Sequence, residues 1–251
     1  MVRIWDMRNF VTSCICALPF SVFLRNVFIM LTFFKKYKVF FITMLVISAT
    51  AISAFYFVLK PKYNLKVYNP ADVNPELVDS LIQYKKRDHH IADFSFVNQN
   101  GKTVTQKDYE NKIYVADFFF TTCQTICPKM TSNMVEVQKA IKDNPKVMLL
   151  SHTVIPEIDS VPVLKKYAIE KGVDDRKWNL VTGDKKAIYD MARKSYLAVK
   201  LGRPEQAYDM VHTENFVLVD SKRRVRGFYD GTNPEAIQKL IEDIEWLSVN
   251  E

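Results

Sequence analysis

Glycine is scarce in this chain of 251 residues, which contains only six. Loops that cradle a phosphate with backbone amides need closely spaced glycines, and the sequence contains no such loop. It also has no internal repeat and no low-complexity tract. Nucleotide-binding classes that depend on a glycine loop, and repeat architectures, are therefore excluded.

Net charge is absent from most of the chain, although the whole carries +7 from 35 basic and 28 acidic residues. Up to Lys62 there are eight basic residues, with Asp6 as the sole acid, so the remainder holds equal numbers of the two signs. A nucleic-acid-binding surface requires a basic patch. We therefore expect no nucleic-acid partner for the globular part.

Cysteine and histidine are also few, with four of each. Cys14 and Cys16 fall in an apolar N-terminal region, so only Cys123 and Cys127 belong to the globular part. Disulfide scaffolds are denser in cysteine and smaller than this domain. The two thiols must instead serve metal binding or thiol chemistry.

One long uncharged run, residues 39–59, predicts a transmembrane helix because about 20 apolar residues span a bilayer. Lysines just before it favour the cytoplasmic side, so we expect a single-pass anchor in the cytoplasmic membrane with the domain on the periplasmic, or extracytoplasmic, side. Residues 1–38 are an N-terminal extension, and we hypothesise that the natural chain starts at Met30. Residues 60–90 are predicted as a linker and residues 91–251 as one domain.

The chain is organised around residues 113–130. An apolar, aromatic run over residues 113–120 predicts a buried strand. Cys123, Cys127 and Pro128 follow, and proline is tolerated in the first turn of a helix. We therefore expect Cys127 at a helix start and Cys123 in the turn before it, a setting that lowers the pKa of a thiol.

Strands and helices alternate through the rest of the chain. Helical spacing and proline caps predict helices, and short β-branched or aromatic runs predict strands. This order indicates a thioredoxin-like α/β fold, a three-layer sandwich behind the transmembrane helix. The predicted strands are 91–97, 113–120, 147–150, 178–182, 215–219 and 224–229, the helices are 128–142, 160–171, 184–196 and 233–247, and residues 197–211 are a loop.

A third ligand for a metal is His212, which precedes the predicted strand at 215–219. In a thioredoxin-like sheet that loop faces the cysteine turn. Two thiolates and one imidazole form a three-coordinate site suited to Cu(I). With one further ligand the same site could also hold Cu(II) or zinc. We keep His152 and the pair His89 and His90 as further ligand candidates, and assign the methionines at 130 and 134 to the core rather than to copper.

Asp117 keeps a second chemistry open. It lies six residues before Cys123, where a thioredoxin has a buried acid that accepts a proton from the second thiol. The alternative is an exposed or salt-bridged strand acid. Asp117, Cys123 and Cys127 are therefore the catalytic candidates if the chain is a thiol-disulfide oxidoreductase.

Three segments resemble the Sco/SenC family of membrane-anchored, thioredoxin-fold copper proteins. Phe120–Pro128 is similar to its F-x-x-C-x-x-x-C-P motif, Thr153–Asp159 to its S-V-D-P-E-x-D segment, and His212 precedes an apolar strand as in the family. The sequence departs from the family at Val211 and Ile155, where acids are usual.

The resemblance implies copper, as Cu(I) or Cu(II), held by Cys123, Cys127 and His212. It implies delivery of copper to the dinuclear copper site of cytochrome c oxidase, or preparation of the thiols of that site. The partner would be the copper subunit of the oxidase or another thiol-bearing copper protein. Such a protein is a metallochaperone rather than an enzyme, and the membrane-tethered oxidoreductase is the alternative.

Overall fold

The computed structural model describes residues 28–29, 32–33, 35–59, 64–198, 200–201, 210–211 and 214–251. The chain forms two compact units, Met1–Tyr63 and Asn64–Glu251. In the first unit, α2 spans Lys38–Leu59 and contains the predicted run 39–59. Its segment Lys38–Tyr56 is long and apolar enough to cross a membrane, by length and composition. The proposed start at Met30 lies outside the described residues.

The second unit is built on a seven-stranded sheet in the order β2-β1-β5-β4-β3-β8-β9. Strands β3, β4 and β5 are parallel, and the other neighbours pair antiparallel. The strands are β1 Ser95–Asn98, β2 Thr103–Thr105, β3 Ile113–Phe119, β4 Val147–Thr153, β5 Trp178–Thr182, β8 Asn215–Val219 and β9 Val225–Asp230. Each predicted strand is therefore present, with shifted ends in most cases.

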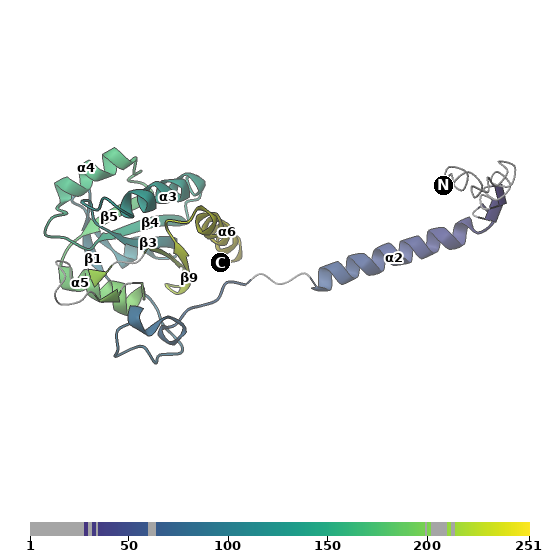
Figure 1. Ribbon diagram of the computed structural model, residues 1–251, viewed down its shortest axis with the longest axis horizontal. Helices are drawn as coiled ribbons and strands as arrows, with labels where there is room; N and C mark the ends of the chain where they lie inside the picture. Colours follow the sequence, from purple (N-terminus) through teal and green to yellow (C-terminus); the bar gives the residue numbers. More distant parts are fainter. Residues whose placement is uncertain are drawn as a thin grey trace, which may run out of the picture. The chain divides into compact units, whose positions relative to one another are not determined.

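Helices cover both faces of the sheet, which confirms the three-layer sandwich (Figure 1). On one face lie α3, α4 and α6, and on the other α5 and the π-helical turn that continues it. Their bounds are α3 Cys127–Ala140, α4 Val161–Lys171, α5 Lys185–Asp190, the π-helical turn Met191–Ser195, and α6 Pro234–Asn250.

Strand β3 is central because it is buried on both faces along all seven residues. Side chains alternate between the faces of a strand. Val115 and Phe119 pack against α3, α4 and α6, while Ala116 and Phe118 pack toward α5. Asp117, between these residues, therefore points to the face that α3 covers.

Local sequence signals account for the helix ends. Asp184 caps α5 by accepting a hydrogen bond from the Ala187 N–H at 2.8 Å. Gly172 ends α4 in the left-handed region at φ 74°, where glycine has no steric penalty. Two predictions were incomplete: the helix at 184–196 changes to a π-helical turn, and the loop at 197–211 contains a hairpin of β6, Lys200–Leu201, and β7, Met210–Val211.

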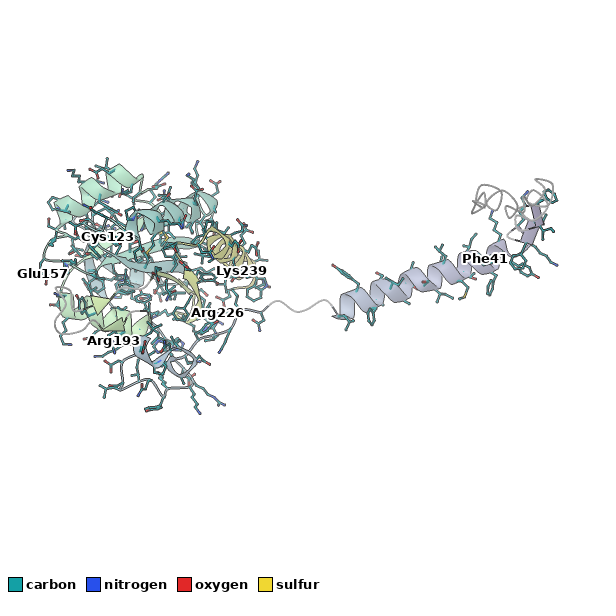
Figure 2. All side chains as sticks on the ribbon, in the orientation of Figure 1. Phe41, Cys123, Glu157, Arg193, Arg226 and Lys239 are labelled. Carbon is teal, nitrogen blue, oxygen red and sulfur yellow. The ribbon has the colours of Figure 1, made fainter. Side chains whose placement is uncertain are left out.

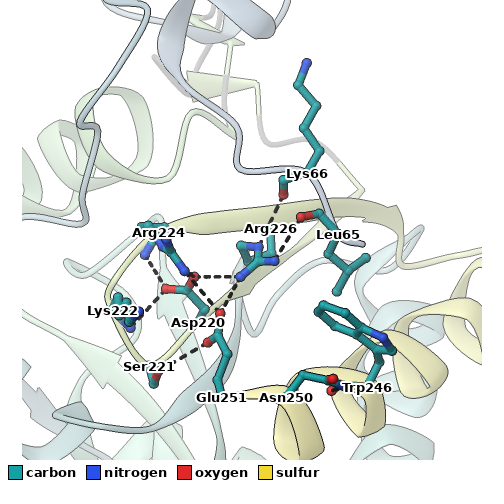
Figure 3. Close-up of polar contacts among 10 residues, drawn as sticks. All are labelled: Leu65, Lys66, Asp220, Ser221, Lys222, Arg224, Arg226, Trp246, Asn250 and Glu251. Atoms are coloured by element: carbon teal, nitrogen blue, oxygen red, sulfur yellow. Dashed lines mark hydrogen bonds and ion pairs between the residues drawn. The ribbon is translucent and has the colours of Figure 1, made fainter. Parts of the chain in front are cut away.

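The segment 64–90, part of the predicted linker, belongs to this second, globular unit, and its first residues contact strand β9 (Figure 3). Arg226 of β9 donates to the backbone oxygens of Leu65 at 2.9 Å and Lys66 at 3.3 Å. Tyr68 forms a β-bridge with Val225, its N–H donating to the Val225 oxygen at 2.8 Å. The start of this segment is therefore fixed to the edge strand β9.

The Arg226 guanidinium is itself held by two acids, of which Asp220 is buried. Its Nη1 lies 2.9 Å from Oδ2 of Asp220, which is fully buried, and 2.5 Å from Oε1 of Glu251. Arg224 contributes a second cation to the same two carboxylates. Such a network is sensitive to the loss of one member, because the remaining buried charges lose their compensation.

Arg226→Met is expected to lower the free energy of unfolding by about 3–5 kcal/mol, since it leaves two acids undercompensated and two backbone oxygens without their donor. The measurement is urea unfolding of the full chain in detergent. Lys139→Met, which removes an exposed pair with Glu136, is the matched control and is expected to cost under about 0.5 kcal/mol. Equal losses of unfolding free energy in the two variants would contradict a stabilising role for the Arg226 network.

Candidate metal-binding and thiol site

The two cysteines lie where the sequence predicts them. Strand β3 ends at Phe119, a turn carries Cys123, and α3 begins at Cys127 with Pro128 in its first turn. The Cys123 N–H donates to the Phe120 oxygen at 3.3 Å, which closes the turn. Figure 2 labels both Cys123 and Arg226 on the globular unit. Cys123 follows the last residue of β3, whereas Arg226 follows Val225, which pairs with Val219 opposite Tyr114 near the start of β3, so the two sites lie toward opposite ends of that strand.

Cys123 is the accessible thiol and the more acidic one. Burial opposes its ionisation, but hydrogen bonds from the Cys127 N–H and thiol and from Thr125 outweigh it and lower the pKa of Cys123 to about 7. The Thr125 hydroxyl oxygen lies 3.6 Å from the Cys123 sulfur. A substantial fraction of Cys123 is therefore thiolate at neutral pH, as the helix-start setting predicts.

Cys127 behaves in the opposite way, and here the sequence-based expectation of a lowered pKa is wrong. The residue is only 1% exposed, and burial raises the pKa of Cys127 to about 12. The negative charges of Cys123 and Asp117 raise it further, against a backbone hydrogen bond from Phe120. Desolvation thus outweighs the helix N-terminus at this position.

Asp117 is a buried acid, 3% exposed, so the alternative of an exposed or salt-bridged residue is wrong. Burial raises the pKa of Asp117 to about 7, and a hydrogen bond from the Ser151 hydroxyl limits the rise. That hydroxyl in turn accepts from the Trp178 indole N–H at 2.8 Å. Near neutral pH this carboxyl group can therefore either release or accept a proton.

His152 lies on the other face of the sheet from Cys127. It pairs with Phe118 in register, and its ring stacks on that of Phe118 with centroids 5.0 Å apart. Phe94, Phe96 and Tyr196 surround it. Burial lowers the pKa of His152 to about 3, so it is a neutral ring inside the core rather than a group at the cysteine turn.

None of the other histidines is seen at the cysteine turn in the part of the chain that the structure describes. His89 is buried, and its Nε2 lies 2.7 Å from the Ser195 backbone oxygen, while His90 is exposed. His212 lies outside the described residues. Among the residues that the structure describes, no three metal-ligating side chains gather at one point. The methionines at 130 and 134 are core residues, as expected.

One residue near the site was not anticipated from the sequence. Asp159 is 1% exposed and accepts hydrogen bonds from the hydroxyls of Thr121 and Thr153 and from the Thr121 N–H, the last at 3.2 Å. It ends the Thr153–Asp159 segment, which carries one of the resemblances. That segment was the signal, but it does not reveal that Asp159 reaches the cysteine turn.

Comparison with known proteins decides the family. The sequence model of SCO1/SenC matches residues 82–248, which is most of the globular unit. The chain belongs to the SCO1/SenC family. Its match therefore covers both cysteines, Asp117 and Asp159.

Relatives within SCO1/SenC share the fold of the globular unit. The "SCO1 protein homolog" of Bacillus subtilis is 33% identical over 162 residues, which are 64% of this chain and 83% of the relative. The solved structure of BsSco, described as a member of the Sco family of cytochrome c oxidase assembly proteins with a disulfide switch, has 33% identity and a TM-score of 0.57, covering 65% of this chain and 96% of BsSco. ScoI of Bradyrhizobium japonicum, solved with copper bound, has 26% identity and a TM-score of 0.52, and the match covers 64% of this chain and 99% of ScoI.

The unequal thiols make a direct prediction about alkylation. At pH 7.5, iodoacetamide is expected to modify Cys123 at least about a hundredfold faster than Cys127, because only the thiolate reacts. Pulse labelling of the reduced full chain, followed by peptide mass spectrometry, measures both rates. The Cys123 rate should rise with pH around a midpoint near 7.

Labelling in urea is the control, since the two thiols lose their different environments on unfolding and should then react at similar rates. Equal rates in the native protein, or faster labelling of Cys127, would show that burial does not separate the thiols.

Proposed function

We propose that this chain binds copper through Cys123, Cys127 and His212 and delivers it during assembly of cytochrome c oxidase. The observation that carries the proposal is the pair of thiols at the β3–α3 turn, in a family with copper-bound members. Thiolate and imidazole ligands suit Cu(I). Copper is the cargo here, so release matters as much as binding.

The donor set fits copper in its chemistry. Cys123 supplies an accessible thiolate near neutral pH, whereas Cys127 must first lose its proton. Binding to both sulfurs is therefore coupled to proton release, and oxidation of the pair to a disulfide prevents it.

The long apolar helix α2 supports a membrane location for this activity. We propose that α2 spans the cytoplasmic membrane once, with the preceding lysines on the cytoplasmic side and the globular unit outside. The copper subunit of the oxidase, or another thiol-bearing copper protein, is the proposed acceptor. A domain that transfers cargo to a membrane-bound acceptor gains from being tethered to the same bilayer.

Anaerobic Cu(I) titration of the reduced full chain in detergent tests the ligand set. Wild type is expected to bind one copper tightly, and His212→Ala to weaken binding at least about tenfold, or ~1.4 kcal/mol. His90→Ala is the matched control, because His90 is exposed on the surface. Weak Cu(I) binding by the wild type, or equal Cu(I) affinities of the two variants, would contradict the copper proposal.

A second candidate function is thiol-disulfide exchange, which Asp117 specifically favours. The Cys123 thiolate attacks a disulfide of the partner and forms a mixed disulfide, releasing one partner thiolate. Cys127 then passes its proton to Asp117 and attacks Cys123, so the partner leaves as a dithiol and the Cys123–Cys127 disulfide remains. Two electrons pass from this chain to the partner.

Asp117→Asn separates the two functions. It is expected to slow closure of the mixed disulfide by roughly tenfold or more at pH 7, the lower end of the range for general-base catalysis, while Cu(I) affinity changes little. Stopped-flow reduction of a dithiobisnitrobenzoate disulfide and copper titration measure the two effects.

Glu110→Gln is the control for that experiment, since Glu110 is exposed and precedes the other end of β3. A large loss of copper affinity in a folded Asp117→Asn protein would mean that Asp117 serves copper rather than proton transfer.

A further inference from the structure

Asp159 joins the cysteine turn to the end of the neighbouring strand. Its Oδ1 accepts from the Thr121 hydroxyl, and its Oδ2 accepts both from the Thr121 N–H at 3.2 Å and from the Thr153 hydroxyl. Thr121 lies two residues before Cys123, and Thr153 is the last residue of β4. One carboxylate thus links two segments that are more than thirty residues apart in sequence.

The link is built into the fold rather than made by a mobile surface side chain. Asp159 is 1% exposed and Thr153 is fully buried. The Thr153 hydroxyl also accepts from the Ile155 N–H at 3.1 Å, and the Asp159 N–H donates to the Ile155 oxygen at 3.0 Å. The carboxylate is therefore held by its own turn before it meets Thr121.

The cysteine turn has two ends, and each is fixed differently. Its second end is Cys127, which is buried at the start of α3. Its first end is Thr121, attached through Asp159. Between them Thr122, Gln124 and Thr125 are exposed, so these two attachments, together with the hydrogen bond from the Cys123 N–H to the Phe120 oxygen, fix the position of Cys123 relative to Cys127.

We propose that Asp159 is a positioning residue, which acts through Thr121 to hold the Cys123 sulfur within reach of the Cys127 sulfur. The inference rests on the proposed thiol and copper function of this pair. Loosening one end of the turn lowers the effective concentration of one sulfur at the other. Both ring closure to a disulfide and joint binding of Cu(I) then become less favourable.

Thr121→Val tests this, because valine keeps the β-branched shape and the backbone N–H but removes the hydroxyl donor. The equilibrium constant for disulfide formation of the full chain in glutathione redox buffer is expected to fall about tenfold, which corresponds to ~30 mV toward a more oxidising potential. Cu(I) affinity is expected to fall by a similar factor. Thr121→Ser, which retains the hydroxyl, should restore both values to within about twofold of wild type.

Thr122→Val is the matched control, since Thr122 is the exposed neighbour of Thr121. If Thr121→Val does not fold, Thr153→Val breaks the link from the other side, with Thr153→Ser as its rescue. A disulfide equilibrium and copper affinity that match wild type in every folded valine variant would overturn the positioning role.

The two proposals fail separately. If wild type binds Cu(I) only weakly but Thr121→Val still shifts the disulfide equilibrium, the copper function fails and the positioning role stands. If wild type binds Cu(I) tightly through His212 while Thr121→Val changes neither measurement, the positioning role fails and the copper function stands.

Discussion

Desolvation of the Cys127 thiol at the start of α3 is the constraint on which the chemistry of the site depends. Cys123 and Cys127 share a turn and a helix N-terminus, yet their pKa values move in opposite directions, because hydrogen bonds lower the pKa of Cys123 while burial raises that of Cys127. One sulfur is therefore ready to attack or to bind, while the other keeps its proton until a base takes it. This inequality gives the pair an order of events, which two equally acidic thiols would lack.

The carboxyl end of β4 supports this arrangement through three consecutive residues. Ser151 holds Asp117 on the face that α3 covers, His152 turns into the aromatic core of the opposite face, and Thr153 holds Asp159. Pleating sends neighbours to alternate faces, so adjacent positions can take unrelated tasks. The strand next to the cysteine strand is thereby part of the site, although it supplies none of the proposed ligands.

Sequence reasoning recovered the parts of this protein that depend on local patterns. The β3 strand, the turn and the α3 start follow from an apolar run and Pro128, and the long apolar helix α2 follows from residues 39–59. The raised pKa of Cys127 could not be foreseen in this way, because its burial is created by helices distant in sequence.

The other features that the sequence did not predict depend on contacts between residues far apart in the chain. The face of His152 depends on its pairing with Phe118, and the role of Asp159 depends on a contact with Thr121 across 38 residues. The β6–β7 hairpin has strands of two residues, too short to carry a period that could be recognised. Burial of Asp117 was left open for the same reason, since an acid in a strand pattern does not reveal what covers it.

The bridge between Tyr68 and Val225 has a consequence for the resistance of this protein to aggregation. Strand β9 ends the sheet, and an unpaired edge is a template for aggregation between chains. Tyr68, in the segment that precedes β1, occupies part of that edge, and at the opposite side β2 offers only three residues. The contacts that attach this segment to β9 therefore also protect the sheet against edge-to-edge association between chains.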